Sequence, residues 1–225
     1  ISQKAKIIVE TFRETTSHKI GGRGKMMVVT SSRLAAVRYF HEVKRYIAEQ
    51  GYDDVQILAA FSGAVPDGGV EYTEPSLNVR ADGSHIAESQ TKKEFHNNFN
   101  VLIVAEKYQT GFDEPLLHTM YVDKVLYDIK AVQTLSRLNR CCPKKYDTFV
   151  LDFANKPEMI QESFSRYYRT TILSGETDPN KLYDLVATME EYQVFSNEDV
   201  ERMVNLYLDG ADRDKLDPTL DACTA

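Results

Sequence analysis

Two arginines and a glutamine recur at close spacing in the run Gln-Thr-Leu-Ser-Arg-Leu-Asn-Arg. These are Gln133, Arg137 and Arg140, four and three residues apart, a spacing that places side chains on one face of an α-helix. Guanidinium groups carry a permanent charge and planar donor forks, so they suit the stabilisation of charge on a transferred phosphoryl group. A solvated basic helix face is the simpler alternative, and the spacing alone leaves both open.

A second candidate is the run Thr-Gly-Phe-Asp-Glu-Pro, which follows an apolar run at 101–104. Gly111 permits a close approach of the backbone to a ligand. The carboxylate of Asp113 can accept hydrogen bonds from a ribose or hold an arginine. Alternatively, Asp113 caps a short helix in an ordinary turn after a strand.

The third candidate is Ser31-Ser32-Arg33, which follows an apolar run and opens a helical pattern. Backbone N–H groups and the helix dipole favour a phosphate at such a place. The simpler interpretation is that Ser31 or Ser32 is the N-cap of the helix. Loops that leave the carboxyl ends of parallel strands share one edge of a sheet, so we expect the three candidate segments to lie there together.

The elements that must position these residues are short apolar runs alternating with helical patterns, which predicts an α/β fold with a mostly parallel sheet covered on both faces. The predicted strands are 26–29, 55–59, 101–104, 119–122 and 148–151, with helices at about 3–18 and 34–50.

Two regions break this alternation. From 62 to 88, prolines and glycines predict a long loop without regular structure. After Asp152 the sequence turns into polar helical stretches, expected at 159–172, 182–192 and 198–208. We therefore predict one domain over 1–155 and a helical linker, or the start of a helical domain, over 156–225.

Composition narrows the class of protein. The chain has 225 residues and a net charge of −7, which argues against a general electrostatic grip on nucleic acid and predicts local contacts instead. Its three cysteines show no metal-ligand spacing, and no histidine pattern indicates a metal site. No apolar stretch is long enough for a membrane span. An odd number of cysteines without CxxC spacing fits reduced cytosolic thiols, so we expect a cytoplasmic protein. Because a starting Met is absent and the sequence begins directly in a helix-like pattern, we expect a fragment of a larger protein.

Taken in order, Thr30 to Arg33, Phe61-Ser62-Gly63, Thr110 to Pro115 and Gln133 to Arg140 resemble motifs of the second RecA-like lobe of superfamily 2 helicases and translocases. The ending Leu-Asn-Arg, followed by Thr-Phe-Val-Leu-Asp-Phe at 148–153, looks specifically like the motor (R) subunit of type I restriction endonucleases. The resemblance covers about residues 1–190 and implies a RecA-like three-layer fold.

The resemblance further implies an ATP-driven DNA motor in which ATP and Mg²⁺ are shared with a first RecA-like lobe. Neither a GxxxxGK[ST] loop nor a DEAD-like acidic box occurs here, so the chain would carry half of the site. On this basis Arg140 would be the arginine finger, assisted by Arg137 and by Gln133, with Gly111 and Asp113 beside the nucleotide. The isolated chain is then expected to be inactive.

The resemblance also implies partners. These are double-stranded DNA, the first lobe and nuclease domain of the same subunit, and the modification and specificity subunits of the restriction complex. The residues expected to touch or flank DNA are Ser31, Ser32, Arg33, Ser62, Gly63 and Thr110. The alternatives are the second lobe of another superfamily 2 DNA helicase and a non-catalytic α/β interaction module that binds a protein or acidic peptide.

Overall fold

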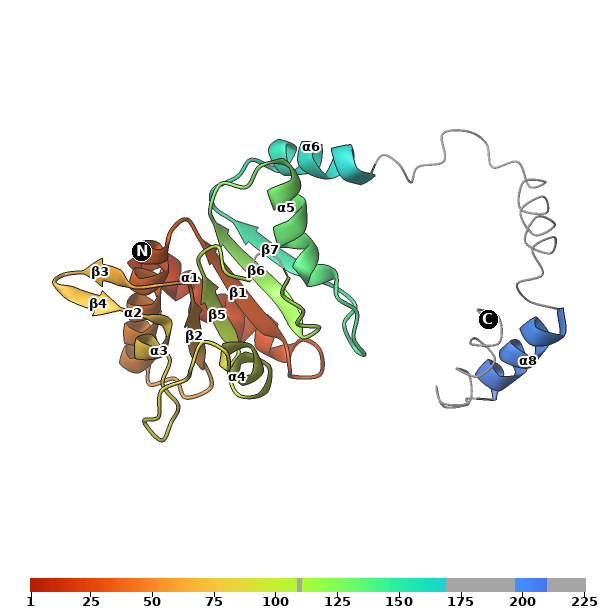
Figure 1. The fold of residues 1–225 in the computed structure, drawn as a ribbon, viewed down its shortest axis with the longest axis horizontal. Helices are drawn as coiled ribbons and strands as arrows, with labels where there is room; N and C mark the ends of the chain where they lie inside the picture. The colour runs from red at the N-terminus through yellow and green to blue at the C-terminus, as the bar shows by residue number, and fades with distance from the viewer. Residues whose placement is uncertain (109–110, 169–196, 210–225) are drawn as a thin grey trace. The chain divides into compact units, whose positions relative to one another are not determined.

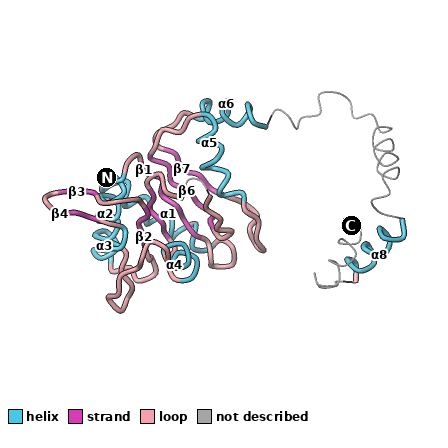
Figure 2. Tube along the Cα trace, viewed as in Figure 1, coloured by secondary structure: helices cyan, strands magenta, loops and turns pink. Residues whose placement is uncertain are grey.

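The computed structural model describes residues 1–108, 111–168 and 197–209. The chain forms two compact units, Ile1–Arg169 and Thr170–Ala225. The first contains a five-stranded sheet with flanking helices (Figures 1 and 2). In the second, helix α8 covers Asn197–Leu208, in agreement with the helix predicted at 198–208. The helix predicted at 182–192 lies outside the described residues. Within the described ranges, no helix is both long and apolar enough to cross a membrane.

The main sheet is entirely parallel and has the strand order β2-β5-β1-β6-β7. Its strands are β1 (Lys25–Thr30), β2 (Ile57–Ala60), β5 (Val101–Val104), β6 (Leu117–Asp123) and β7 (Phe149–Asp152). The register aligns Met26 with Val101 on one side and with Thr119 on the other. This arrangement confirms the predicted α/β class and all five predicted strands.

Helices cover both faces of this sheet. Successive side chains of each strand point to opposite faces, where they contribute to two separate apolar clusters. Met26 and Val28 point into the cluster formed with α1 (Ser2–Glu14) and α2 (Arg33–Gln50). Met27 and Val29 point into the opposite cluster, formed with α4 (Thr91–Asn97), α5 (Asp128–Leu135) and the 3-10 turn η2 (Ser136–Asn139). A second 3-10 turn, η1 (Thr16–His18), follows α1. The result is a three-layer fold.

Strand β2 lies at one edge of the sheet, and side chains from the 62–88 segment satisfy its backbone. The amide of buried Asn78 donates to Ala59 O at 2.8 Å and accepts from Ala59 N at 2.8 Å, as a neighbouring strand would. Buried Glu74 accepts from Phe61 N at 3.1 Å and from Lys107 Nζ at 2.7 Å. This segment therefore closes the edge without adding a strand to the sheet.

The expectation of an irregular loop over 62–88 is wrong in part. The segment contains a two-stranded hairpin of β3 (Val65–Asp67) and β4 (Val70–Tyr72), followed by the single helical turn α3 (Glu74–Leu77). Gly68 and Gly69 form the two-residue connection at φ +59° and +82°, the backbone that a type I′ hairpin turn requires.

Strand β7 lies at the other edge and is less covered than predicted, since Phe149 and Val150 remain 39% and 38% exposed. Helix α6 (Pro157–Tyr168) follows it and packs through Ile160 and Phe164 against the α5 side of the sheet. The domain boundary at 155/156 stays a prediction. Helix α6 belongs to the first compact unit, Ile1–Arg169.

Candidate functional site

The candidate residues lie at the two opposite ends of the parallel strands. We call the side of the sheet where the strands end the carboxyl edge and the side where they begin the amino edge, as distinct from the outer strands β2 and β7. Ser31 to Arg33 follow the carboxyl end of β1, and Ser62 and Gly63 follow that of β2. The segment 105–116, however, leaves the carboxyl end of β5 and returns to the amino end of β6, because the two strands are parallel. Asp113 lies four residues before the start of β6. The expectation that all three segments meet at the carboxyl ends is therefore wrong.

At the carboxyl edge, Arg33 connects two of the predicted segments. Its Nη1 donates to Ser62 O at 2.9 Å, and a Cβ atom on Gly63, which has φ +75°, would lie 3.2 Å from the same nitrogen. Ser32 is the N-cap of α2, since its Oγ accepts from Ala35 N at 3.1 Å. Ser31, Ser32 and Arg33 are all exposed. This edge thus presents hydroxyl groups, a helix N-terminus and one guanidinium to solvent.

At the amino edge, the structure brings Asp113 and Arg140 together across 27 residues of chain. Arg140 Nε lies 3.1 Å from Asp113 Oδ1, and the two side chains are 51% and 62% exposed. Next to them, Arg137 Nη1 donates to Phe112 O at 3.2 Å. Residues from two separate connections therefore converge here, and holding an arginine is one of the roles that the sequence left open for Asp113.

Gln133, Arg137 and Arg140 do not share one face of an α-helix as predicted, because only Gln133 lies on the α-helix. Helix α5 ends at Leu135, and residues 136–139 form a 3-10 turn, which has three residues per turn instead of 3.6. Arg140 follows this turn in an extended conformation, at φ −67° and ψ 125°. Arg140 is thus held by a loop, while Gln133 stays on the helix.

Near Asp113 and Arg140 the structure shows contacts of Glu114, His96 and Lys145, which the sequence analysis did not identify. The buried carboxylate of Glu114 accepts from Leu116 N at 3.0 Å and lies 2.9 Å from His96 Nδ1. Lys145 Nζ donates to Leu117 O at 2.7 Å and to Arg140 O at 2.9 Å. Burial lowers the pKa of Lys145, against an opposing effect of the neighbouring thiols and Glu114. Glu114 lies in the Thr-Gly-Phe-Asp-Glu-Pro run but was given no role there, and it is the one sequence feature that could have pointed to this cluster.

The segment that joins the two edges has an unusual backbone. Glu106 and Tyr108 have positive φ values of 62° and 65°, which non-glycine residues rarely adopt, and Gly111 has φ +67°. The rings of Tyr108 and Phe112 lie 4.9 Å apart, and Phe112 is buried in the core. Strained backbone of this kind often occurs at functional sites. Thr110 lies outside the described residues.

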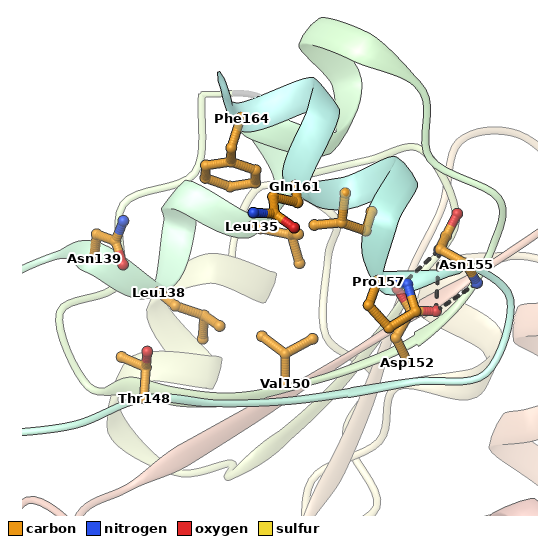
Figure 3. A pocket seen from close by; sticks show the side chains of 11 residues that line it. Leu135, Leu138, Asn139, Thr148, Val150, Asp152, Asn155, Pro157, Gln161 and Phe164 are labelled. Atoms are coloured by element: carbon orange, nitrogen blue, oxygen red, sulfur yellow. Dashed lines mark hydrogen bonds between the residues drawn. The ribbon is translucent and has the colours of Figure 1, made fainter. Parts of the chain in front are cut away.

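A pocket of about 590 Å³ lies between η2, β7 and α6 (Figure 3). Figure 3 shows Leu138, Val150 and Phe164 turned toward it, with Asp152 and Asn155 at one end. The Asp152 carboxylate accepts from Asn155 Nδ2 and from the backbone N–H of Ala154 and Asn155 at 2.9–3.0 Å. The Asp152 carboxylate is engaged in this turn, and most of the pocket's lining surface is apolar, so the pocket offers few polar groups to a ligand. None of the predicted site residues lines it.

Comparisons with known proteins agree on one family. Residues 76–155 match the family model of type I restriction enzyme subunit R domain 3. A putative type I restriction enzyme MjaVIIP endonuclease subunit of Methanocaldococcus jannaschii is 29% identical over 175 residues, which cover 74% of this chain and 16% of that protein. The HindI endonuclease subunit of Haemophilus influenzae is 24% identical over 157 residues, which cover 65% of this chain and 14% of that protein. The chain thus spans about a sixth of these relatives.

Solved structures give weaker similarities. The Pyrococcus furiosus Hef helicase domain matches 74% of this chain and 27% of its own, with a TM-score of 0.37 and 16% identity. A Saccharomyces cerevisiae Dbp5 variant matches 83% of this chain and 42% of its own, with a TM-score of 0.42 and 12% identity. The sequence relatives share one description, and the match to domain 3 spans the Asp113–Arg140 pair. The sequence of this chain is therefore similar to the R, or endonuclease, subunits of type I restriction enzymes.

Proposed function

We propose that this chain supplies one half of the ATP site of a DNA translocase, as part of a type I restriction R subunit. The observation that carries the proposal is the Asp113–Arg140 pair at the amino edge of the sheet. Both side chains are about half exposed, so neither is committed to the core. A guanidinium held at an open edge can reach a phosphate that a second domain brings to it.

In this proposal Arg140 exchanges Asp113 for the γ-phosphate of ATP and stabilises the charge that develops during phosphoryl transfer. Asp113, once released, accepts a hydrogen bond from a ribose hydroxyl. Arg137 assists, since its bond to Phe112 O fixes it beside the same segment. Gln133 orients the site from α5, and Gly111 leaves room for the nucleotide.

The triphosphate loop and the Mg²⁺ ligands are assigned to a first lobe outside this sequence. The chain contains no GxxxxGK[ST] pattern, and across its described residues no three His, Cys, Asp or Glu side chains gather as a metal site would need. Bound Mg²⁺ would neutralise charge between the phosphates, while this chain's own residues bind and orient the nucleotide. On its own, the chain should therefore not hydrolyse ATP.

DNA is assigned to the carboxyl edge. Ser31, Ser32, Arg33, Ser62 and Gly63 lie there, and their hydroxyl and N–H groups suit contacts to phosphates, which position a motor without reading sequence. Since the net charge is −7, this contact is local and needs other parts of the subunit. Thr110, which lies outside the described residues, stays a proposed DNA contact. ATP and DNA thereby occupy opposite edges, joined by the segment 105–116.

The proposed assembly has the partners expected for a type I restriction complex. These are the first RecA-like lobe and nuclease domain of the same subunit, the modification and specificity subunits, and double-stranded DNA in the cytoplasm. The activity of the whole would be ATP-dependent type I site-specific deoxyribonuclease.

The test is Arg140→Ala in the complete R subunit. An arginine finger contributes about 10³- to 10⁵-fold to turnover, so DNA-stimulated ATP hydrolysis should fall by that order. The melting temperature should stay within experimental error of the parent protein's, because an exposed ion pair contributes about 0–1 kcal/mol. The matched control is Arg38→Ala, since Arg38 is 52% exposed and paired with Asp67. Unchanged turnover in Arg140→Ala would overturn the proposal and favour a non-catalytic interaction module.

A further inference from the structure

Lys145 forms a three-way contact directly behind the candidate ATP edge. Its Nζ donates to Pro115 O at 3.1 Å, to Leu117 O at 2.7 Å and to Arg140 O at 2.9 Å. We propose that Lys145 is a positioning residue, which holds Arg140 in place relative to Asp113 so that the guanidinium meets the phosphate. This inference rests on the proposed function, because it concerns the placement of the proposed arginine finger.

The chemistry of this contact fits lysine closely. An ammonium group has three donors and no acceptor, and here three carbonyl oxygens from two separate segments accept from it. Partial burial of a charged group costs free energy unless its donors have hydrogen-bond partners, and here the three carbonyl oxygens provide them. Cys142 Sγ adds a second tie from the same segment, at 3.3 Å from Pro115 O.

The place of Arg140 in the chain explains why it needs such a tie. It follows η2 in an extended conformation, so no helical hydrogen bond fixes its backbone. Lys145 closes a short loop back onto the Arg140 carbonyl and ties that loop to Pro115 and Leu117, which lie two and four residues after Asp113. One ammonium group therefore ties together the backbones of the two segments that carry Asp113 and Arg140.

The kinetic test uses Lys145→Met in the complete R subunit, since methionine keeps an unbranched stem and removes the donors. Misplacement of a reacting group by about 1 Å can reduce rate by about 10²-fold, so we expect kcat of DNA-stimulated ATP hydrolysis to fall about 10- to 100-fold with a much smaller change in the KM for ATP. Lys145→Arg, which keeps a charge and donors, should restore part of kcat. The control Lys144→Met, at the exposed neighbouring lysine, should retain full turnover.

A double variant shows whether Lys145 acts through Arg140. If it does, Arg140→Ala combined with Lys145→Met should have the kcat of Arg140→Ala alone, because a misplaced side chain that is already absent has no further effect. A double variant far slower than Arg140→Ala would mean that Lys145 supports the domain in general, which would overturn the positioning role.

A structural readout separates this inference from the proposed function. In the 225-residue chain, Lys145→Met should speed hydrogen–deuterium exchange in peptides that cover 112–118 and 138–146, with β1 unchanged as an internal control. Unchanged exchange would refute the tie itself. Faster exchange with normal turnover in Lys145→Met, alongside an inactive Arg140→Ala, would refute the positioning role and leave the proposed function standing. Normal turnover in both variants would refute the proposed function.

Discussion

Removal of the Asn78 side chain should test how the edge strand β2 is held. Asn78→Ala deletes both hydrogen bonds to Ala59, each 2.8 Å long, and leaves the N–H and C=O of a fully buried residue without partners. An unsatisfied buried backbone group costs about 1–3 kcal/mol, so the two together should lower the free energy of unfolding by about 3 kcal/mol. For a domain of this size that loss corresponds to a fall of about 6–12 °C in melting temperature.

The assay is urea and thermal unfolding of the 225-residue chain, followed by circular dichroism. Asn78→Leu, which keeps a similar volume, should lose nearly as much stability, because the hydrogen bonds and not the packing are responsible. Asn97→Ala at an exposed position of α4 is the matched control and should change the unfolding free energy by less than about 0.5 kcal/mol. A loss below about 1 kcal/mol in Asn78→Ala would show that the edge strand does not depend on this side chain.

Two further perturbations test the amino edge. Burial lowers the pKa of His118 while Asp147 opposes the shift, so the stability that neutral His118 provides is complete above about pH 6.5 and is lost as pH falls below that value. The test compares the urea midpoint at about pH 7.5 with the midpoint at about pH 5.5. The difference between the two midpoints should be smaller in His118→Gln than in the parent chain, whereas the control His18→Gln, at an exposed position, should show the same difference as the parent chain. Equal differences in all three proteins would contradict the role given to His118. In Gly24→Ala the new Cβ would lie 2.1 Å from Thr16 O, so the melting temperature should drop by the equivalent of about 3 kcal/mol; a value near that of the parent chain would refute the predicted clash.

The parts of the fold that could be predicted are those determined by local pattern. The run Val-Leu-Ile-Val gives β5 at 101–104, and α2 begins after the cap Ser32 and ends at Gly51 in a left-handed conformation. The hairpin of β3 and β4 escaped prediction because each strand has three residues and Pro66 weakens the strand pattern. Its Gly68-Gly69 connection was a usable signal.

The candidate site was less accessible to sequence reasoning, because its geometry depends on long-range contacts. Asp113 and Arg140 were identified by residue type, but their edge of the sheet follows from a return segment, 105–116, whose described residues form no helix. The end of α5 at Leu135 also could not be seen in the spacing of Gln133, Arg137 and Arg140. Lys145 could not be identified from the sequence, because its three partners are backbone carbonyls, which any residue type provides.

The connection between β5 and β6 has a fixed length for a mechanical reason. Phe112 anchors it in the core, and Asp113 must reach Arg140 immediately afterwards. An added or deleted residue in 105–116 would shift one of these two contacts. The Gly68–Gly69 hairpin tip is the opposite case, since no atom lies within 4 Å of a Cβ built on either glycine. That tip is accordingly the place to insert a fluorophore or epitope without disturbing either edge of the sheet.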